Sequence, residues 1–299
     1  MITELLRKIV RSNRVQKVAL ASGALEDLAR PYITGKTPEA ARDVARDMVK
    51  KGLLVGFSYL PASDSEAESL AELRRLLQLL GDEAKDMELS VKPSQLGIRE
   101  SEEAAEKSLR GLVERAGDLG ALVTLEMQGV NHYAETLRLW EKVRADHPHL
   151  GVTLPVEVRR AERDCARLVE EGSPRMRLCI GSYPVPKSLG IQDEHEKTKA
   201  LVRCLRLAME GGARVMLATH HPTVIAIGQE LARRHPQGEL EFQMFHGVRP
   251  LEQRRLSDIG HRSRVLLPYG PAGFEYLMTR VAARPQTAVS YLRAITDKR

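Results

Sequence analysis

The residues best suited to chemistry stand at the ends of short apolar segments, and Arg177 is the most informative of them. It lies inside the apolar segment 176–180. A guanidinium is costly to bury without a partner. A buried Arg177 must therefore meet a carboxylate, a phosphate or an electron-rich cofactor. The first of these options is an internal salt bridge with Glu126 or Glu157.

The other candidate residues share one position, in or just after an apolar segment. They are Tyr59; Lys92, Ser94 and Gln95; Glu126 and Gln128; Glu157; Tyr183; Thr219, His220 and His221; Gln243 and His246; and Tyr269. Each alone is as consistent with a hydrogen-bonded rim residue as with a catalytic one. A metal site on the glutamates and the two histidines is disfavoured, because adjacent residues of an extended chain point apart. We therefore predict no metal site.

Eight apolar segments alternate with stretches of helical period, and this alternation predicts the elements that carry those residues. The expected strands are 53–60, 87–91, 121–127, 151–158, 176–180, 214–218, 240–245 and 264–267. The expected helices are 102–119, 133–146, 161–171, 195–210, 223–234 and 251–259. Ser101 and Thr37, the latter followed by Pro38, are suitable N-caps. Several expected helices end at glycine, as helices often do: Gly120, Gly172 and Gly211–Gly212.

Strands that alternate with helices indicate a parallel α/β sheet, and eight strands allow that sheet to close. The predicted fold is a (β/α)8 TIM-type barrel with short N-terminal helices. A barrel needs about 250 residues, which fits a chain of 299 residues. We expect residues 1–50 to form a helical extension on the bottom or side of a catalytic barrel at 51–299. A doubly wound open sheet is the alternative, but no GxGxxG follows the first strand.

Composition excludes several classes of protein. The net charge of +6 is spread along the chain, with no basic run interleaved with aromatics, which argues against nucleic-acid binding. Cys165, Cys179 and Cys204 support neither a disulfide framework nor a CxxC metal site. No segment approaches 18 uninterrupted apolar residues. We expect no transmembrane segment and a cytoplasmic protein, with peripheral membrane association as the alternative.

Several motifs occur in the order in which the proline dehydrogenases carry them, and the chain resembles that family. They are SVKPSQLG at 90–97, TLEMQ at 124–128, RLCIGSY at 177–183, ATHH at 218–221, LEFQMFHG at 240–247 and LLPYG at 266–270. YLMTRVAARP at 276–285 is similar to the family's closing helix. The match runs over roughly residues 50 to 295 of the sequence.

The resemblance implies an FAD-binding barrel that moves a hydride from an amino-acid ring to the flavin and passes the electrons to a quinone or other acceptor. It implies that Arg177 faces the flavin N5 side, where a guanidinium stabilises the charge of reduced flavin. It places Thr219 and His220 against the cofactor. It also implies that Lys92 lies beside the substrate and pairs with Glu126. All three charged residues are thereby expected to be catalytic.

The resemblance assigns further residues to both ligands. Gly181, Ser182 and Gln243 are expected at the cofactor, together with the residues already named. Lys92, Tyr183, Leu266, Thr279 and Arg280 are expected at the substrate. Arg280 would bind a substrate carboxylate.

The chain departs from the family pattern mainly within the site. Glu126 replaces Asp, Pro155 replaces a flavin-binding Gln, Ile180 replaces Lys, Leu266 replaces Tyr, Thr279 replaces the first of two arginines, and Ala283 replaces Glu. Loss of one arm of an arginine pair weakens carboxylate recognition by about 1.5–3 kcal/mol. The changes at Leu266 and Thr279 argue against ordinary proline as the best substrate, whereas those at Pro155 and Ile180 bear on the binding of FAD.

Two hypotheses follow, from different functional classes. The first is a proline dehydrogenase-like flavoprotein of amino-acid metabolism that oxidises a proline-related or other cyclic or secondary amine or amino acid. The second is a repurposed barrel of the same family that binds a small ligand without flavin redox activity.

Overall fold

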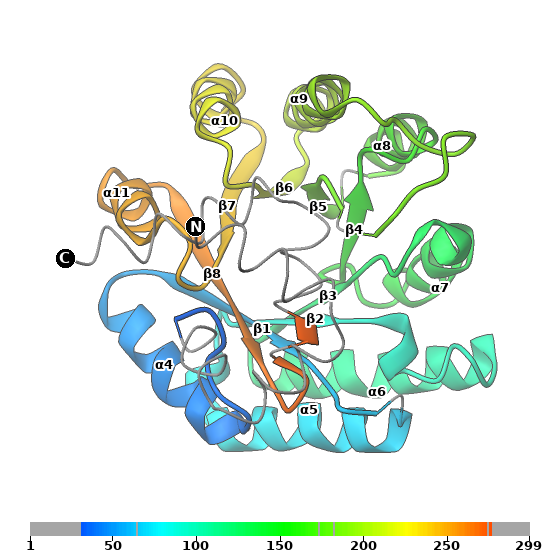
Figure 1. Ribbon diagram of the computed structural model, residues 1–299, viewed down its shortest axis with the longest axis vertical. Helices are drawn as coiled ribbons and strands as arrows, with labels where there is room; N and C mark the ends of the chain where they lie inside the picture. Colours follow the sequence, from blue (N-terminus) through cyan, green and yellow to red (C-terminus); the bar gives the residue numbers. More distant parts are fainter. Residues whose placement is uncertain (1–30, 64, 173, 182, 274, 277–299) are drawn as a thin grey trace, which may run out of the picture.

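Eight parallel strands close into a barrel in the computed structural model, which describes residues 31–276 except 64, 173, 182 and 274 (Figure 1). The strands are β1 (Leu54–Tyr59), β2 (Glu88–Val91), β3 (Leu122–Leu125), β4 (Gly151–Pro155), β5 (Arg175–Cys179), β6 (Arg214–Ala218), β7 (Glu239–Phe245) and β8 (Arg262–Tyr269). Each strand pairs with the next along the chain, and β8 pairs with β1. The predicted TIM-type barrel is confirmed.

The first and last strands of the barrel have a long register. Leu54 pairs with Arg264, and the pairing continues without a break to Tyr59 and Tyr269. Because every strand has two neighbours, no sheet edge is left open within the described chain. All eight predicted strands are present, and their ends differ from the expected ones by a few residues at most.

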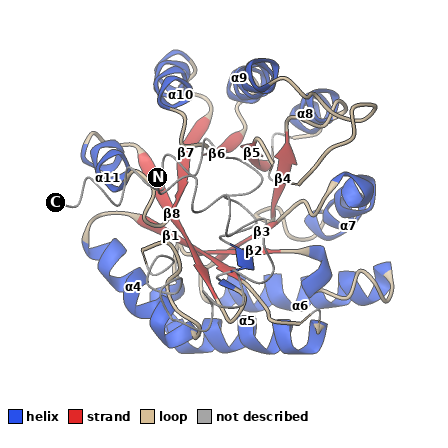
Figure 2. Ribbon diagram, in the orientation of Figure 1, coloured by secondary structure: helices blue, strands red, loops and turns tan. Residues whose placement is uncertain are grey.

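Helices surround the barrel on its outer side (Figure 2). They are α4 (Pro38–Lys50), α5 (Glu66–Leu80), α6 (Glu102–Asp118), α7 (Tyr133–Arg144), α8 (Ala161–Glu170), α9 (Glu194–Glu210), α10 (Pro222–Arg234) and α11 (Pro250–Asp258). Short 3-10 turns are η1 (Gly81–Ala84), η2 (Pro93–Gln95) and η3 (Val130–His132). In the described part of the chain, no helix combines the length and apolarity that crossing a bilayer requires.

Local sequence explains where these helices begin and end. The Ser101 hydroxyl accepts a hydrogen bond from the backbone N–H of Ala104 at 3.0 Å, and α6 begins there. Thr37 caps α4 in the same way, and Pro38 takes the first helical position. After α6 the chain turns at Gly120, whose φ of 68° lies in the left-handed region. Both predicted N-caps are confirmed.

Helix α4 completes the outer ring between β8 and β1 (Figure 1). It packs against both strands and against α5. Ala41 and Ala45 of this helix are fully buried in the same apolar core as the barrel. The N-terminal helical segment expected on the side of the barrel therefore includes α4, while residues 1–30 lie outside the described residues.

The main apolar core lies between the strands and the helices, because alternate strand residues point outward. Leu89, Trp140 and Leu217 are among its fully buried members. The inward-pointing residues are different. A TIM barrel is usually filled by bulky branched side chains, but here several inward positions carry buried charges, and these positions belong to the site.

Candidate active site

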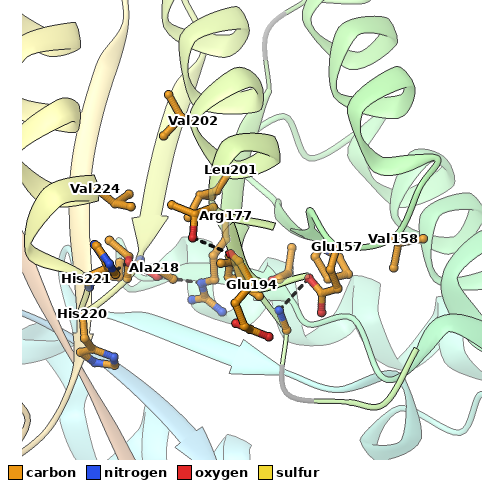
Figure 3. A pocket seen from close by; sticks show the side chains of 18 of the residues that line it. Glu157, Val158, Arg177, Glu194, Leu201, Val202, Ala218, His220, His221 and Val224 are labelled. Atoms are coloured by element: carbon orange, nitrogen blue, oxygen red, sulfur yellow. Dashed lines mark hydrogen bonds between the residues drawn. The ribbon is translucent and has the colours of Figure 1, made fainter. Parts of the chain in front are cut away.

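A cavity of about 1410 Å³ opens at the carboxyl ends of the strands and extends between α9 and α10 (Figure 3). This volume exceeds the roughly 300–1,000 Å³ that is usual for small-molecule sites. Ten of the residues predicted from the sequence line it: Glu126, Glu157, Arg177, Gly181, Tyr183, Thr219, His220, His221, Gln243 and Leu266. Ser182, Thr279 and Arg280 lie outside the described residues.

Lys92 stands at the start of η2, just past the end of β2. Its Nζ lies 5.8 Å from the centroid of the Tyr276 ring. The carboxylate of Glu126, expected to pair with Lys92, lies 3.7 Å from Nη1 of Arg177. The Lys92–Glu126 pair therefore stays a prediction.

Arg177 is 4% exposed and is held by side chains from two other strands. Its Nε donates to Oε1 of Gln243 at 2.7 Å, and its Nη2 donates to the Ser90 hydroxyl at 2.7 Å. Nη2 also donates to Oε1 of Glu88. The guanidinium is thus fixed beneath the cavity, with Nη1 on the side of Glu126.

The main carboxylate partner of Arg177 differs from the two that the sequence suggested. Glu88, from inside β2, makes the close ion pair, whereas Glu126 makes only a longer one. Glu157 instead accepts a hydrogen bond from the backbone N–H of Gly181 at 2.9 Å. An added Cβ at Gly181 would lie 2.5 Å from Glu157 Oε1, so these two residues are closely fitted.

A buried charge network lies below Arg177 inside the barrel. Glu88 is fully buried, and its second oxygen accepts a hydrogen bond from Arg175. A second pair joins Arg264 to Glu241, with Nε to Oε1 at 2.6 Å. Gln243 connects the two pairs, because its amide donates to Glu241 at 2.8 Å and to Glu88 at 3.4 Å. We define these six residues as the barrel network.

With both carboxylates ionised, the three arginines and two glutamates give the barrel network a net charge of +1. Burial alone would raise the pKa of Glu88, but Arg177, Arg175 and Arg264 outweigh burial and hold that pKa below its usual value. Burial likewise acts to raise the pKa of Glu241, yet Arg264 and Gln243 lower it to about 2. Paired charges are needed here because an unpaired buried charge is strongly destabilising.

Arg264 also ties the bottom of the barrel together. Its Nη1 donates to the backbone oxygen of Val55 at 2.6 Å and to that of Asp86 at 2.8 Å. The side chain is fully buried. Arg264 therefore joins β8 to β1, to Asp86 just before β2 and, through Glu241, to β7.

One wall of the cavity comes from the ends of β6 and β7. Nε2 of His220 accepts a hydrogen bond from the backbone N–H of Phe245 at 3.0 Å, which fixes the proton of a neutral ring on Nδ1. The Thr219 hydroxyl accepts from the N–H of His221 at 3.1 Å. Helix α10 begins next, and its first turn lines the cavity. A helix N-terminus favours anions.

Sequence reasoning missed four charged members of the barrel network, although a signal for them exists. Glu88 stands four residues before Lys92, Arg175 two before Arg177, Glu241 two before Gln243, and Arg264 two before Leu266. Side chains two apart on a strand share a face. Charges at these positions therefore had to point to the same side as the candidate site residues.

Known proteins resemble this chain in sequence and in fold. Proline dehydrogenase 1 of Bacillus subtilis (strain 168) is 31% identical over 276 residues, which is 90% of this chain and 91% of that protein. Proline dehydrogenase of Deinococcus radiodurans is 26% identical over 304 residues, or 96% and 97% of the two chains. No protein-family model matches the chain.

The solved structures that resemble the chain support the fold. Proline utilization A from Bdellovibrio bacteriovorus, inactivated by N-propargylglycine, superposes with a TM-score of 0.80 at 18% identity. The likeness covers 93% of this chain and 38% of that one. Proline utilization A from Corynebacterium freiburgense gives a TM-score of 0.71 at 17% identity, over 98% of this chain and 34% of its own.

Proposed function

Because this chain belongs to the proline dehydrogenase family, we propose that it oxidises a proline-related or other cyclic or secondary amine or amino acid by hydride transfer to FAD. The observation that carries this proposal is Arg177, a guanidinium fixed beneath a cavity large enough for a dinucleotide. When bound, FAD supplies a two-electron acceptor for the hydride of the carbon next to the amine nitrogen. A quinone or other acceptor would then remove the electrons.

The residues at the barrel end of the cavity fit a flavin ring. Arg177 gives a cation there, and Gln243 orients its guanidinium through a 2.7 Å hydrogen bond. A positive group held in advance stabilises negative charge as it develops, without reorganisation during the reaction. Arg177 thereby favours the reduced, anionic form of the ring.

The residues at the outer end of the cavity fit a diphosphate. The first turn of α10 lines this end, and so do Lys199 and Arg203 of α9, which pair in this structure with Glu196 and Glu162. Helix N-termini and basic side chains are the groups that proteins use for phosphate. One cavity therefore provides donors for the flavin ring and for the diphosphate of FAD.

The substrate face of the site is more apolar than the family pattern implies. Leu266 lines the cavity and is buried, while Tyr183 lines it from the exposed mouth. Apolar surface at Leu266 supports a substrate with a larger or substituted ring. Lys92 and Glu126 stay our candidates for holding the substrate amine and its proton.

One observation favours the second candidate function, a barrel that binds a small ligand without redox chemistry. Pro155 and Ile180 both line the cavity, at positions where the family pattern has Gln and Lys. Neither side chain donates a hydrogen bond, so an FAD molecule would make fewer polar contacts here.

The first experiment distinguishes the two functions by absorbance between about 350 and 500 nm, where a bound flavin absorbs. We expect the purified protein, after incubation with excess FAD and desalting, to show flavin bands that bleach with a cyclic amine or amino acid. A protein that stays colourless under these conditions would support the second function.

A pair of arginine variants tests the role of Arg177. We expect Arg177→Ala to slow flavin reduction by about 10²–10³-fold, the usual effect of removing one preorganised donor, and to weaken FAD binding less. Arg203→Ala, at the outer end, should weaken FAD binding and leave the rate of reduction nearly unchanged. Equal reduction rates in Arg177→Ala and the parent protein would refute the role.

A further inference from the structure

We propose that Glu88 is a positioning residue for Arg177, which it holds in place and partly neutralises, and that it thereby sets the reduction potential of the flavin. Only the effect on the reduction potential of the flavin rests on the proposed function. Glu88 is fully buried on β2, and each of its two oxygens accepts a hydrogen bond from a different arginine. It bridges Arg175 and Arg177 from below the cavity.

Glu88 is the main charged anchor of Arg177. Ser90 and Gln243 also bind the guanidinium, but both are neutral. Glu126 is charged, yet it is 3.7 Å from Nη1 and its side chain is 26% exposed. A buried, close carboxylate acts more strongly than a distant, hydrated one, because the local dielectric is lower.

The neutral anchor Gln243 depends on Glu88 as well. Gln243 accepts from Nε of Arg177 through its oxygen, so its amide group must point the other way, toward Glu88 and Glu241. Loss of the Glu88 carboxylate would remove one acceptor for this amide together with the ion pair. Arg177 and Gln243 are therefore expected to shift together.

The charge of Glu88 also determines how much of the arginine's field reaches the cavity. A flavin above Arg177 meets the sum of the guanidinium and the carboxylate beneath it. Without the carboxylate, the reduced anionic ring would be stabilised more strongly. Glu88→Gln should therefore raise the two-electron reduction potential, whereas Arg177→Ala should lower it.

Glu241→Gln is the matched control, because it removes the same charge from the same barrel network. Glu241 is buried and pairs with Arg264, and it reaches Arg177 only through Gln243. Both variants should be destabilised, because each leaves a buried arginine short of its carboxylate. Only Glu88→Gln should act directly on Arg177.

The experiment combines one measurement that needs FAD and one that does not. The reduction potential of the FAD-loaded parent, Glu88→Gln and Glu241→Gln is measured against redox dyes. We expect Glu88→Gln to change the relative affinity for reduced and oxidised FAD by about tenfold, or about 30 mV for a two-electron couple. We expect a much smaller shift in Glu241→Gln.

The second measurement follows the side-chain Nε–H signal of Arg177 by NMR in protein labelled with ¹⁵N-arginine, without FAD, with the signal assigned through Arg177→Lys. Glu88→Gln should move this signal, and Glu241→Gln should move it less. Glu88→Asp, which keeps the charge but shortens the reach, replaces Glu88→Gln if that variant does not fold. It should move the signal while its potential stays near that of the parent.

The outcomes separate this inference from the proposed function. An Arg177 signal that moves equally in Glu241→Gln and in the Glu88 variant, or in neither, overturns the positioning role. A moved signal with an unchanged potential in Glu88→Gln overturns the control of potential. If the parent takes up no FAD, the proposed function fails, and the NMR signal still decides whether Glu88 positions Arg177.

Discussion

Glu241 should make the stability of the protein depend on pH in acid solution. Its pKa is lowered from 4.5 to about 2 in the folded protein. A group with a lowered folded pKa contributes stability above its unfolded pKa and loses that contribution as the pH falls toward the folded value. The contribution of Glu241 to stability should therefore be lost between about pH 5 and pH 2.

The size of the effect follows from the shift. The difference of 4.5 and 2 is 2.5 pKa units, and one unit is worth about 1.4 kcal/mol, which gives about 3 kcal/mol. Because Glu241 is buried against Arg264, solvent screens little of this contribution. Glu241→Gln cannot titrate and should be less stable than the parent at pH 7 by about 3–5 kcal/mol.

The assay is urea unfolding at several pH values from 7 down to the lowest at which both proteins fold. The gap between parent and Glu241→Gln should narrow as the pH falls below about 4.5. Glu230→Gln is the control, because the pKa of Glu230 is also about 2 but its partners Arg233 and Arg234 lie on the exposed surface of α10. Parallel stability curves for parent and Glu241→Gln, or an equal effect of Glu230→Gln, would refute the reasoning.

Three further substitutions test other parts of the structure. Ser101→Ala should lower the unfolding free energy by about 1 kcal/mol in urea, because the N–H of Ala104 loses its cap, and Ser101→Asp should restore it. Trp140→Ala should lower it by about 3–5 kcal/mol, measured by circular dichroism, since the ring is fully buried in the core. Gly181→Ala should weaken FAD binding in a fluorescence titration more than it lowers stability, because its Cβ would press on Glu157; equal binding would show that this wall can move.

The sequence predicted the barrel because the signals it depends on are local. Apolar segments, helical period and caps such as Ser101 are visible within a few residues, and the observed strands follow them. Helix α5 was missed, although Ser65 caps it and its leucines repeat at helical spacing. The signal for this helix is therefore present in residues 61–85 of the sequence.

The rim of the site was predicted together with Arg177 and Gln243 of its interior, whereas the other four members of the barrel network were missed. Thr219 follows β6 and Gln243 lies near the end of β7, and all carboxyl ends of a closed parallel barrel meet at one face. The partner of Arg177 could not be found in this way, because Glu88 comes from a different strand and reaches it across the interior. Which inward side chains meet depends on how the strands are staggered on closure, and one strand's sequence does not contain that stagger.

The bond between Arg264 and the Val55 oxygen has a consequence for how the chain is made. The two residues are 209 positions apart. At a synthesis rate of about 5–20 residues per second, roughly 10–40 s pass between the synthesis of β1 and that of its partner strand β8. Before β8 is made, the Val55 oxygen and the Glu241 carboxylate lack the guanidinium that binds them in the folded protein. A barrel without β8 is therefore expected to be unstable. Nascent chains that end before β8 should accordingly be sensitive to proteases and should bind chaperones.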